Sequence, residues 1–304
     1  MHKRARVIYN PTSGRELIKK HLPDVLDILE GAGYEASAHA TKGEDDATLA
    51  AKEAVERGFD IIVAAGGDGT LKEVITGVAP FEKRPKVGLI PTGTTNDFSR
   101  ALHIPRDILE AAQVIADGHS KAIDVGQKNE DEYFINIAGG GHLTELTYDV
   151  PIKLKTMLGQ LAYYLKGIEM LPSIHASHLR IEYDGKVYEE EAMMFLLALT
   201  NSVGGFEKIS PDAELDDGYF TLMALKKCNI ADFIRLATLA VRGEHLDDPL
   251  VFHTKAREVK VTSHDKVLLN LDGEYGGKVP ATFRNLHQHI EFFVPKGMFS
   301  SDEA

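Results

Sequence analysis

The sequence predicts an α/β protein in two parts, a doubly wound, mostly parallel sheet domain followed by a mostly antiparallel β-sandwich or barrel domain. Continuous apolar strands alternate with amphipathic helices up to residue 123, which is typical of a parallel sheet covered on both faces. Beyond that point, several strands alternate apolar and polar residues instead. We expect domains at 1–124 and 125–294, with 295–304 returning to the first and a cleft between the halves.

The first half reads as repeated strand and helix units. Residues 16–29 carry apolar side chains at helical spacing and end near Gly31 and Gly33, which predicts a helix with a glycine stop. The same reasoning gives strands at 7–9, 34–40, 61–65 and 87–90, and further helices at 45–58 and 108–116.

The second half favours strands separated by turn signals. Asp184-Gly185 and Asp217-Gly218 are typical hairpin turns, so the strands on either side are predicted to pair antiparallel. The predicted strands are 133–138, 179–183, 187–200, 220–225, 258–262, 266–271 and 289–294, with helices at 152–171 and 230–241.

Composition excludes several classes of function. A net charge of −12 argues against general affinity for nucleic acid. Cys228 is the only cysteine, so an internal disulfide cannot form, and the 13 histidines show no metal-like spacing. The longest apolar run, 192–199, is too short to cross a bilayer, and the first residues lack the apolar core of a signal peptide. We therefore expect a cytoplasmic protein.

The strongest motif is residues 66–70, Gly-Gly-Asp-Gly-Thr, between an apolar strand and a helix-like segment. Glycines let the backbone approach a ligand closely, and the free amides of a helix N-terminus attract phosphate oxygens. Asp68 would repel phosphate unless a cation such as Mg²⁺ lies between them. The alternative is an ordinary strand-to-helix turn.

Two further loops follow strands of the same predicted sheet, residues 10–14 and 91–98. Ligands of open α/β sheets bind at the carboxyl ends of the strands, so the three loops are expected to meet around one phosphate chain. Taken singly, Asn10-Pro11 is a common turn and Thr95-Asn96 a common helix cap.

A fourth segment, residues 269–275, belongs to the second half. Asp272-Gly273 is a frequent hairpin turn and nothing more on its own. Glu274, just beyond it, is placed to take a proton from a hydroxyl if Asp68 and Asp97 hold Mg²⁺ against a transferring phosphoryl group.

Taken together, these motifs resemble the bacterial lipid kinases of the soluble diacylglycerol kinase type, which belong with sphingosine kinases and eukaryotic diacylglycerol kinase catalytic domains. NAD kinases and phosphofructokinases share the Gly-Gly-Asp-Gly motif but lack the same later motifs. The resemblance covers essentially the whole chain. The matching segments are Asn10-Pro11 with Ser13-Gly14, and residues 66–73, 91–98, 212–219 and 271–274.

The resemblance implies roles for individual residues. Glu274 would be the general base, with Asp68 and Asp97 in a carboxylate, water and Mg²⁺ network beside it. The residues implied in ATP contact are Asn10, Pro11, Thr12, Ser13, Gly14, Thr41, Gly66, Gly67, Asp68, Gly69, Thr70, Leu71, Lys72 and Thr94. A second, structural Mg²⁺ would bind the side chain of Asp217 and backbone oxygens of Glu214 and Tyr219, where the residues alone favour a hairpin turn.

The implied reaction is Mg²⁺-dependent transfer of phosphate from ATP to diacylglycerol, giving ADP and phosphatidic acid for phospholipid biosynthesis. The alternatives are another hydroxylated lipid (a sphingoid base, a ceramide or a polyprenol), a soluble acceptor such as NAD, or a nucleotide-binding regulator without catalysis. A homodimer is compatible with this assignment.

The helix predicted at 152–171 has apolar residues at helical spacing and three lysines, Lys153, Lys155 and Lys166. The simpler interpretation is a helix packed on the second domain. The alternative is that this surface, with Arg100, makes transient peripheral contact with the membrane that holds the lipid.

Overall fold

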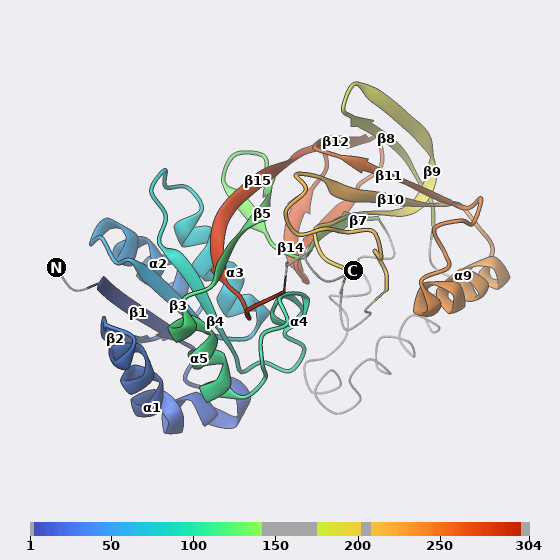
Figure 1. The fold of residues 1–304 in the computed structure, drawn as a ribbon. Coiled ribbons are helices and arrows are strands. Elements are labelled where there is room, and N and C mark those ends of the chain that lie inside the picture. The colour runs from blue at the N-terminus through green and yellow to red at the C-terminus, as the bar shows by residue number, and fades with distance from the viewer. Residues whose placement is uncertain (1–2, 142–174, 202–207, 299–304) are drawn as a thin grey trace. The chain divides into compact units, whose positions relative to one another are not determined.

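The computed structural model describes residues 3–141, 175–201 and 208–298 (Figure 1). The chain forms two compact units, Met1–Ile123 with Gln288–Ala304, and Asp124–His287. Each unit is described by itself, and the expected cleft between the halves stays a prediction. The helix predicted at 152–171 lies outside the described residues.

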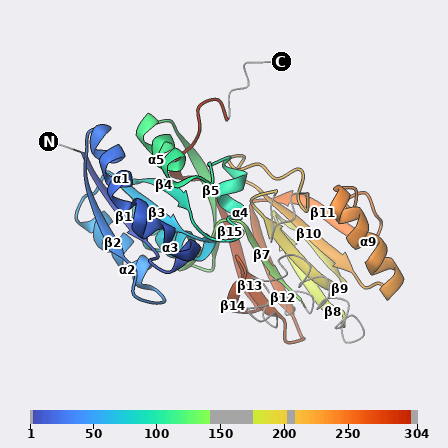
Figure 2. The same ribbon diagram turned by 90° about the horizontal axis from the view of Figure 1, so that it is seen from below.

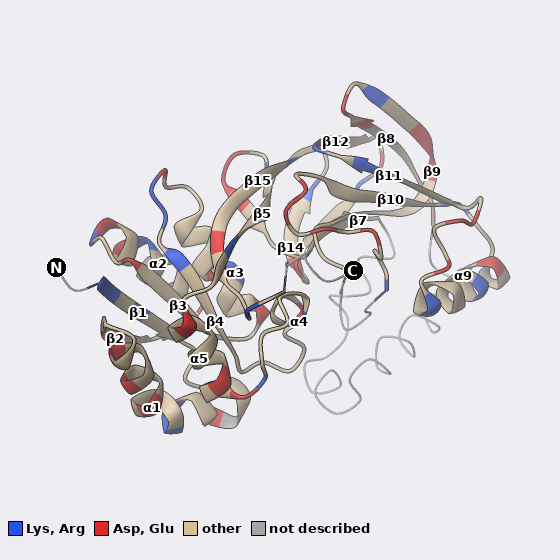
Figure 3. Ribbon diagram, viewed as in Figure 1, with Lys and Arg blue, Asp and Glu red and all other residues tan. Residues whose placement is uncertain are grey.

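The first unit is built on a parallel sheet. Its strands are β1 (Lys3–Tyr9), β2 (Tyr34–Ala40), β3 (Ile61–Gly66) and β4 (Lys86–Pro91). They lie in the order β4-β3-β1-β2 and every neighbouring pair is parallel. β3 is central, buried at every position and free of charged residues (Figure 3), which is why its sequence is a continuous apolar run.

Helices cover both faces of this sheet. They are the 3₁₀ turn η1 (Ser13–Glu16), α1 (Leu17–Gly31), α2 (Asp46–Glu56), α3 (Asp68–Val78), α4 (Asp97–Ala101) and α5 (Ile108–Asp117). α1 packs with α5 and α2 packs with α3, one pair on each face (Figure 2). This arrangement confirms the predicted doubly wound sheet.

The C-terminal part of the chain completes the first unit. The last residues of strand β15 (Ala281–Phe293) run parallel to β4, with Phe292 opposite Val87. The ring of Phe292 lies 5.1 Å from that of Phe98 in α4, and both side chains are fully buried. Residues 288–298 therefore belong with the first unit, because their partners are β4 and α4.

The second unit consists mainly of antiparallel strands. They are β6 (Glu132–Phe134), β7 (Ile137–Gly140), β8 (Ser177–Tyr183), β9 (Lys186–Ala198), β10 (Phe220–Lys226), β11 (Val251–Ala256), β12 (Glu258–Ser263), β13 (Leu268–Leu271) and β14 (Glu274–Lys278), with the end of β5 (Ser120–Lys128) and the start of β15. The first half of β9 pairs with β8, and its second half lies between β7 and β10. The antiparallel pairing confirms the second part of the predicted fold class.

Aromatic side chains fill the core of the second unit. Phe134 stacks on Phe220 at 5.6 Å, and the ring of Phe283 lies 6.3 Å from both Phe134 and Phe195. These four side chains are fully buried. The unit also carries α9 (Ile230–Arg242), and none of the described helices is long and apolar enough to cross a membrane.

Candidate active site

The strands of the first unit end in register at one edge of the sheet. Tyr9 at the end of β1 lies opposite Ala65 of β3, and Gly66 lies opposite Pro91 at the end of β4. The loops that follow these strands therefore leave the sheet side by side, as the sequence predicts. The amide of Asn10 still donates to the carbonyl of Ala65 at 3.0 Å, so the first loop begins against the second.

The first and third loops are in direct contact. The hydroxyl of Thr92 donates to Ser13 Oγ at 3.0 Å. Gly14 has φ +57°, and a Cβ at that position would lie 2.4 Å from the carbonyl oxygen of Thr92. Only glycine fits this left-handed position without moving the neighbouring loop.

The second and third loops pack backbone against backbone. A Cβ on Gly93 would lie 2.6 Å from the Cα of Gly67, and the amide of Thr92 donates to the carbonyl of Gly66 at 2.8 Å. Asn96, with φ 51°, closes the third loop because its side chain accepts from the amide of Gly93 and donates to the Gly93 carbonyl. Glycines in both loops thus permit an approach that side chains would block.

Asp68 connects the second loop to α4. It is the first residue of α3, and its carboxylate accepts the amides of Asp97 at 3.1 Å and Phe98 at 3.4 Å. Asp97 is itself only 7% exposed, and Arg100 Nη1 lies 3.8 Å from its Oδ1. The structure therefore brings two of the three predicted catalytic carboxylates into one cluster.

The electrostatics of this cluster favour a cation. Burial, with a further contribution from the nearby charge of Asp97, raises the pKa of Asp68, although backbone amides partly oppose the shift. Two adjacent carboxylates supply the hard oxygen donors that Mg²⁺ prefers, and a bound cation would offset their mutual repulsion. Asp68 and Asp97 thus fit a magnesium ion chemically.

The other residues predicted to contact ATP lie around the same edge. The amide of Thr41 donates to the carbonyl of Tyr9, and Thr94 is exposed in the third loop. The side chain of Leu71 is buried, and its amide donates to the carbonyl of Gly67 at 3.1 Å. Pro11, Thr12, Gly69, Thr70 and Lys72 lie in the first two loops or the first turns of α3.

In the second unit, Asp272-Gly273 forms the tight turn between β13 and β14. Both residues have positive φ, 53° and 90°, as a type I′ turn requires. The Asp272 carboxylate also accepts the amides of Ile135 at 2.8 Å, Asn136 at 2.8 Å and Ile137 at 2.9 Å. This acid is therefore an anchor for the segment between β6 and β7, a role that the sequence analysis did not predict.

Glu274 begins β14 directly after this turn, opposite Leu271 in the register. Its side chain is exposed, as is that of Tyr275. Glu274 belongs to the second unit, whereas Asp68 and Asp97 belong to the first. The anchored turn fixes the backbone that carries Glu274.

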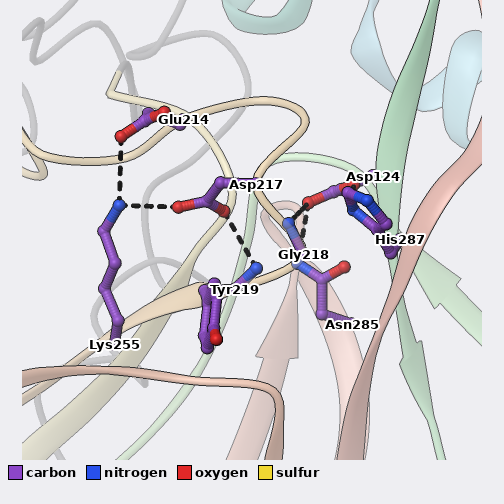
Figure 4. Close-up of polar contacts among 8 residues, drawn as sticks. All are labelled: Asp124, Glu214, Asp217, Gly218, Tyr219, Lys255, Asn285 and His287. Carbon is purple, nitrogen blue, oxygen red and sulfur yellow. Dashed lines mark hydrogen bonds and ion pairs between the residues drawn. The ribbon is translucent and has the colours of Figure 1, made fainter.

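The loop expected to hold a second cation is fastened by a lysine (Figure 4). Asp217 Oδ1 accepts the amide of Tyr219 at 2.9 Å, and its Oδ2 lies 2.6 Å from the ammonium of Lys255. Glu214 Oε1 lies 3.2 Å from the same ammonium. Among the described residues, no group of three or more histidine, cysteine or acidic side chains is arranged to hold a metal ion.

Asp124, which the sequence analysis passed over, holds the other end of this loop. Its side chain is fully buried; Oδ2 accepts from the amide of Gly218 at 2.7 Å and from Asn285 Nδ2 at 3.2 Å. Oδ1 lies 3.1 Å from His287 Nδ1, and the Asp124 amide donates to Leu215. The sequence did hold a signal for this role: Asp124 lies between Ile123 and Val125, two apolar β-branched residues that are buried in the structure. A carboxylate in such a position is buried as well and requires hydrogen-bond partners.

Comparison with known proteins decides the family. The diacylglycerol kinase catalytic domain family matches residues 4–128, and the YegS C-terminal NAD kinase beta sandwich-like domain family matches residues 149–294. A curated diacylglycerol kinase of Bacillus subtilis (strain 168) is 63% identical over 295 residues, 97% of each chain. The chain belongs to the diacylglycerol kinase family. This confirms the resemblance inferred from the sequence motifs.

Further members of the diacylglycerol kinase family show the same full-length likeness. A diacylglycerol kinase of Staphylococcus epidermidis is 55% identical over 302 residues, 99% of this chain and 95% of its own. The crystal structure of a diacylglycerol kinase from Bacillus anthracis superposes with a TM-score of 0.82 at 30% identity, covering 97% of this chain and 98% of that one. The likeness therefore includes both units.

Proposed function

We propose that this protein transfers the γ-phosphoryl group of ATP to the hydroxyl of diacylglycerol, producing phosphatidic acid and ADP. The observation that carries this proposal is the cluster of Asp68 and Asp97 where three glycine-containing loops meet at the carboxyl edge of a parallel sheet. The curated relatives at 63% and 55% identity are named diacylglycerol kinases, which supports the choice of reaction and acceptor.

In this proposal the first unit binds ATP. The amides around residues 10–14 and 66–70 and the N-terminus of α3 are the groups that attract phosphate oxygens. The close contacts at Gly14, Gly67 and Gly93 hold the three loops together at this edge, and glycines carry no side chain to block the approach of a triphosphate. Thr41, Leu71, Lys72 and Thr94 complete the proposed contact set.

Asp68 and Asp97 would hold Mg²⁺, directly or through water. When bound, the ion neutralises charge on the phosphate oxygens. The contribution of the chain is to keep two carboxylates in place: the backbone amides at the start of α4 orient Asp68, and Arg100 lies beside Asp97.

Glu274 is proposed as the general base. As the acceptor oxygen attacks the γ-phosphorus, the bond from that phosphorus to the β,γ-bridging oxygen breaks and ADP leaves with the bond electrons. The proton of the acceptor hydroxyl passes to the Glu274 carboxylate. The anchored Asp272-Gly273 turn supports this role because it fixes the backbone before the base.

A radiolabelled ATP assay with a panel of acceptors tests the proposal. We expect label to appear in phosphatidic acid when diacylglycerol is supplied, and to require both Mg²⁺ and Asp68, since Asp68→Ala should abolish transfer. Transfer only to a sphingoid base, a ceramide, a polyprenol or NAD would show that this compound, and not diacylglycerol, is the acceptor. No transfer to any of them would favour the non-catalytic regulator.

The lipid acceptor also implies transient contact with a membrane surface. Replacing Lys153, Lys155 and Lys166 by glutamate should weaken activity on anionic vesicles and leave activity on detergent-dispersed lipid unchanged. Equal loss in both assays would reject a role for these lysines in membrane contact.

A further inference from the structure

The ammonium of Lys255 lies against two carboxylates of the 214–219 loop, the segment where the resemblance implies a cation. It lies 2.6 Å from Asp217 Oδ2 and 3.2 Å from Glu214 Oε1, so it bridges two carboxylates of one loop (Figure 4). Lys255 comes from β11, a separate strand, and therefore fastens the loop to the sheet. Asp217 is mostly buried at 17% exposure, which strengthens this pair relative to an ordinary surface ion pair.

Two further contacts hold the same loop without a metal ion. At its end, the amide of Gly218 donates to the buried carboxylate of Asp124. The guanidinium of Arg257, just beyond β11, lies over the ring of Tyr219 at 4.5 Å from the centroid, within the range of a cation–π interaction. The loop thus meets three side chains from two segments of the chain, and two of them, Lys255 and Arg257, are cations.

The charge on Lys255 persists at neutral pH. A lysine ammonium is charged at neutral pH, and this one lies 2.6 Å from one carboxylate and 3.2 Å from another. A permanent positive charge and a divalent cation repel each other strongly at a few ångströms. The Lys255 ammonium and a divalent cation therefore cannot both contact Asp217 Oδ2 at the same time.

We propose that Lys255 is the built-in cation of the 214–219 loop, and that a divalent cation binds Asp217 only by displacing the Lys255 ammonium. The oxygens of this loop suit a hard cation, but the structure supplies their positive partner from within the chain. This inference goes beyond the proposed function, because neither the phosphoryl donor nor the acceptor enters it.

Divalent cation affinity of the nucleotide-free full-length protein tests the competition. We would measure Mn²⁺ and Mg²⁺ binding by titration calorimetry for the wild type and for Lys255→Met, which keeps the aliphatic stem and removes the charge. Asp217→Asn removes the carboxylate of this loop, so any cation binding that this variant loses can be assigned to the loop. Lys227→Met is the matched control, since it breaks a lysine–carboxylate pair of 2.8 Å with Glu191 elsewhere in the second unit.

Lys255→Met should bind the cation about tenfold more tightly than the wild type, because a like charge has been removed from the site. The gain should vanish in the double variant with Asp217→Asn and be absent in Lys227→Met. Without divalent cation, Lys255→Met should unfold at a lower temperature than the wild type, and added Mg²⁺ should recover most of the difference. Equal cation affinities in the wild type and Lys255→Met, or no binding by either, would overturn the proposal.

A second measurement uses the wild-type protein and does not depend on the folding of a variant. A displaced lysine amine reacts faster with acylating reagents than one held against carboxylates. Mass spectrometry after brief acetylation should therefore show Lys255 modification rising with Mg²⁺, while that of Lys227 stays constant. Unchanged Lys255 reactivity at Mg²⁺ concentrations that saturate the protein would also reject the displacement.

Discussion

The carboxylate of Asp68 accepts a hydrogen bond of 3.1 Å from the amide of Asp97, while the charge of the Asp97 side chain raises the pKa of Asp68. The same neighbour thus supports Asp68 through its backbone and opposes its ionisation through its side chain. Burial adds to the opposition and is the larger cause.

This balance predicts that Asp68→Asn is inactive but more stable than the wild type at neutral pH without metal. Because the folded-state pKa is raised, the folded wild type binds more protons than the unfolded chain between the two pKa values. Its free energy of unfolding therefore falls as pH rises through that window and stays lower above it. Thermal unfolding between about pH 4 and pH 8 should show the advantage of Asp68→Asn shrinking towards acid. An advantage that grows towards acid would contradict the assigned cause.

Gly93→Ala should disturb the nucleotide loops. The new Cβ would lie 2.6 Å from the Cα of Gly67 and 2.7 Å from Asn96 Oδ1, so two loops must separate. We expect a loss of about 1–3 kcal/mol in the free energy of unfolding and weaker ATP binding, measured by denaturant unfolding and calorimetry. Gly43→Ala is the control because a Cβ added at Gly43 would have no neighbouring atom within 4 Å among the described residues. Similar effects of both changes would refute the packing argument.

Asp272→Asn should destabilise the second unit while keeping the turn, since asparagine tolerates positive φ. The amide side chain has one acceptor oxygen where the carboxylate has two, and three backbone amides depend on it. A loss of about 2–4 kcal/mol is expected in urea unfolding. Asp184→Asn changes the aspartate of a second Asp-Gly hairpin, which is exposed and accepts two backbone amides, those of Arg257 and Glu258, so it should cost less.

Glu274→Gln tests the base separately from folding. The side chain is exposed, so the melting temperature and ATP affinity should match those of the wild type. Removing a general base lowers turnover by about 10²–10⁴-fold. Exposed Glu130→Gln should retain full activity. A Glu274→Gln protein with wild-type turnover would end the assignment of Glu274.

The parts of the fold and site that follow from local patterns were predictable. β3 was recognisable because burial at all its positions gives it a continuous apolar sequence. The three loops were recognisable because each follows the end of an apolar strand. Asp272-Gly273 was recognised as a hairpin turn because that dipeptide forms type I′ turns. Its anchoring function was not, because the amides that it holds, at residues 135–137, lie about 135 positions earlier in the chain.

The features that could not be predicted from the sequence are long-range side-chain pairs and short helices or strands. Lys255 lies outside every strand that the sequence predicted, and only the folded structure reveals Asp217 and Glu214 against its ammonium. α4 has five residues, too few for a helical periodicity. β14 contains two glycines, which lower strand propensity, so its pairing with β13 shows only in the structure.

Strand β15 determines when each unit can fold during synthesis. Its first residues pair with β12, and its end places Phe292 against β4 and the ring of Phe98. The first unit, although it begins at the N-terminus, is therefore finished last, after the ribosome has made all of the second. Nascent chains stopped before residue 288 lack Phe292, so the surface of Phe98 that its ring contacts would be exposed, and we expect such chains to be prone to aggregate.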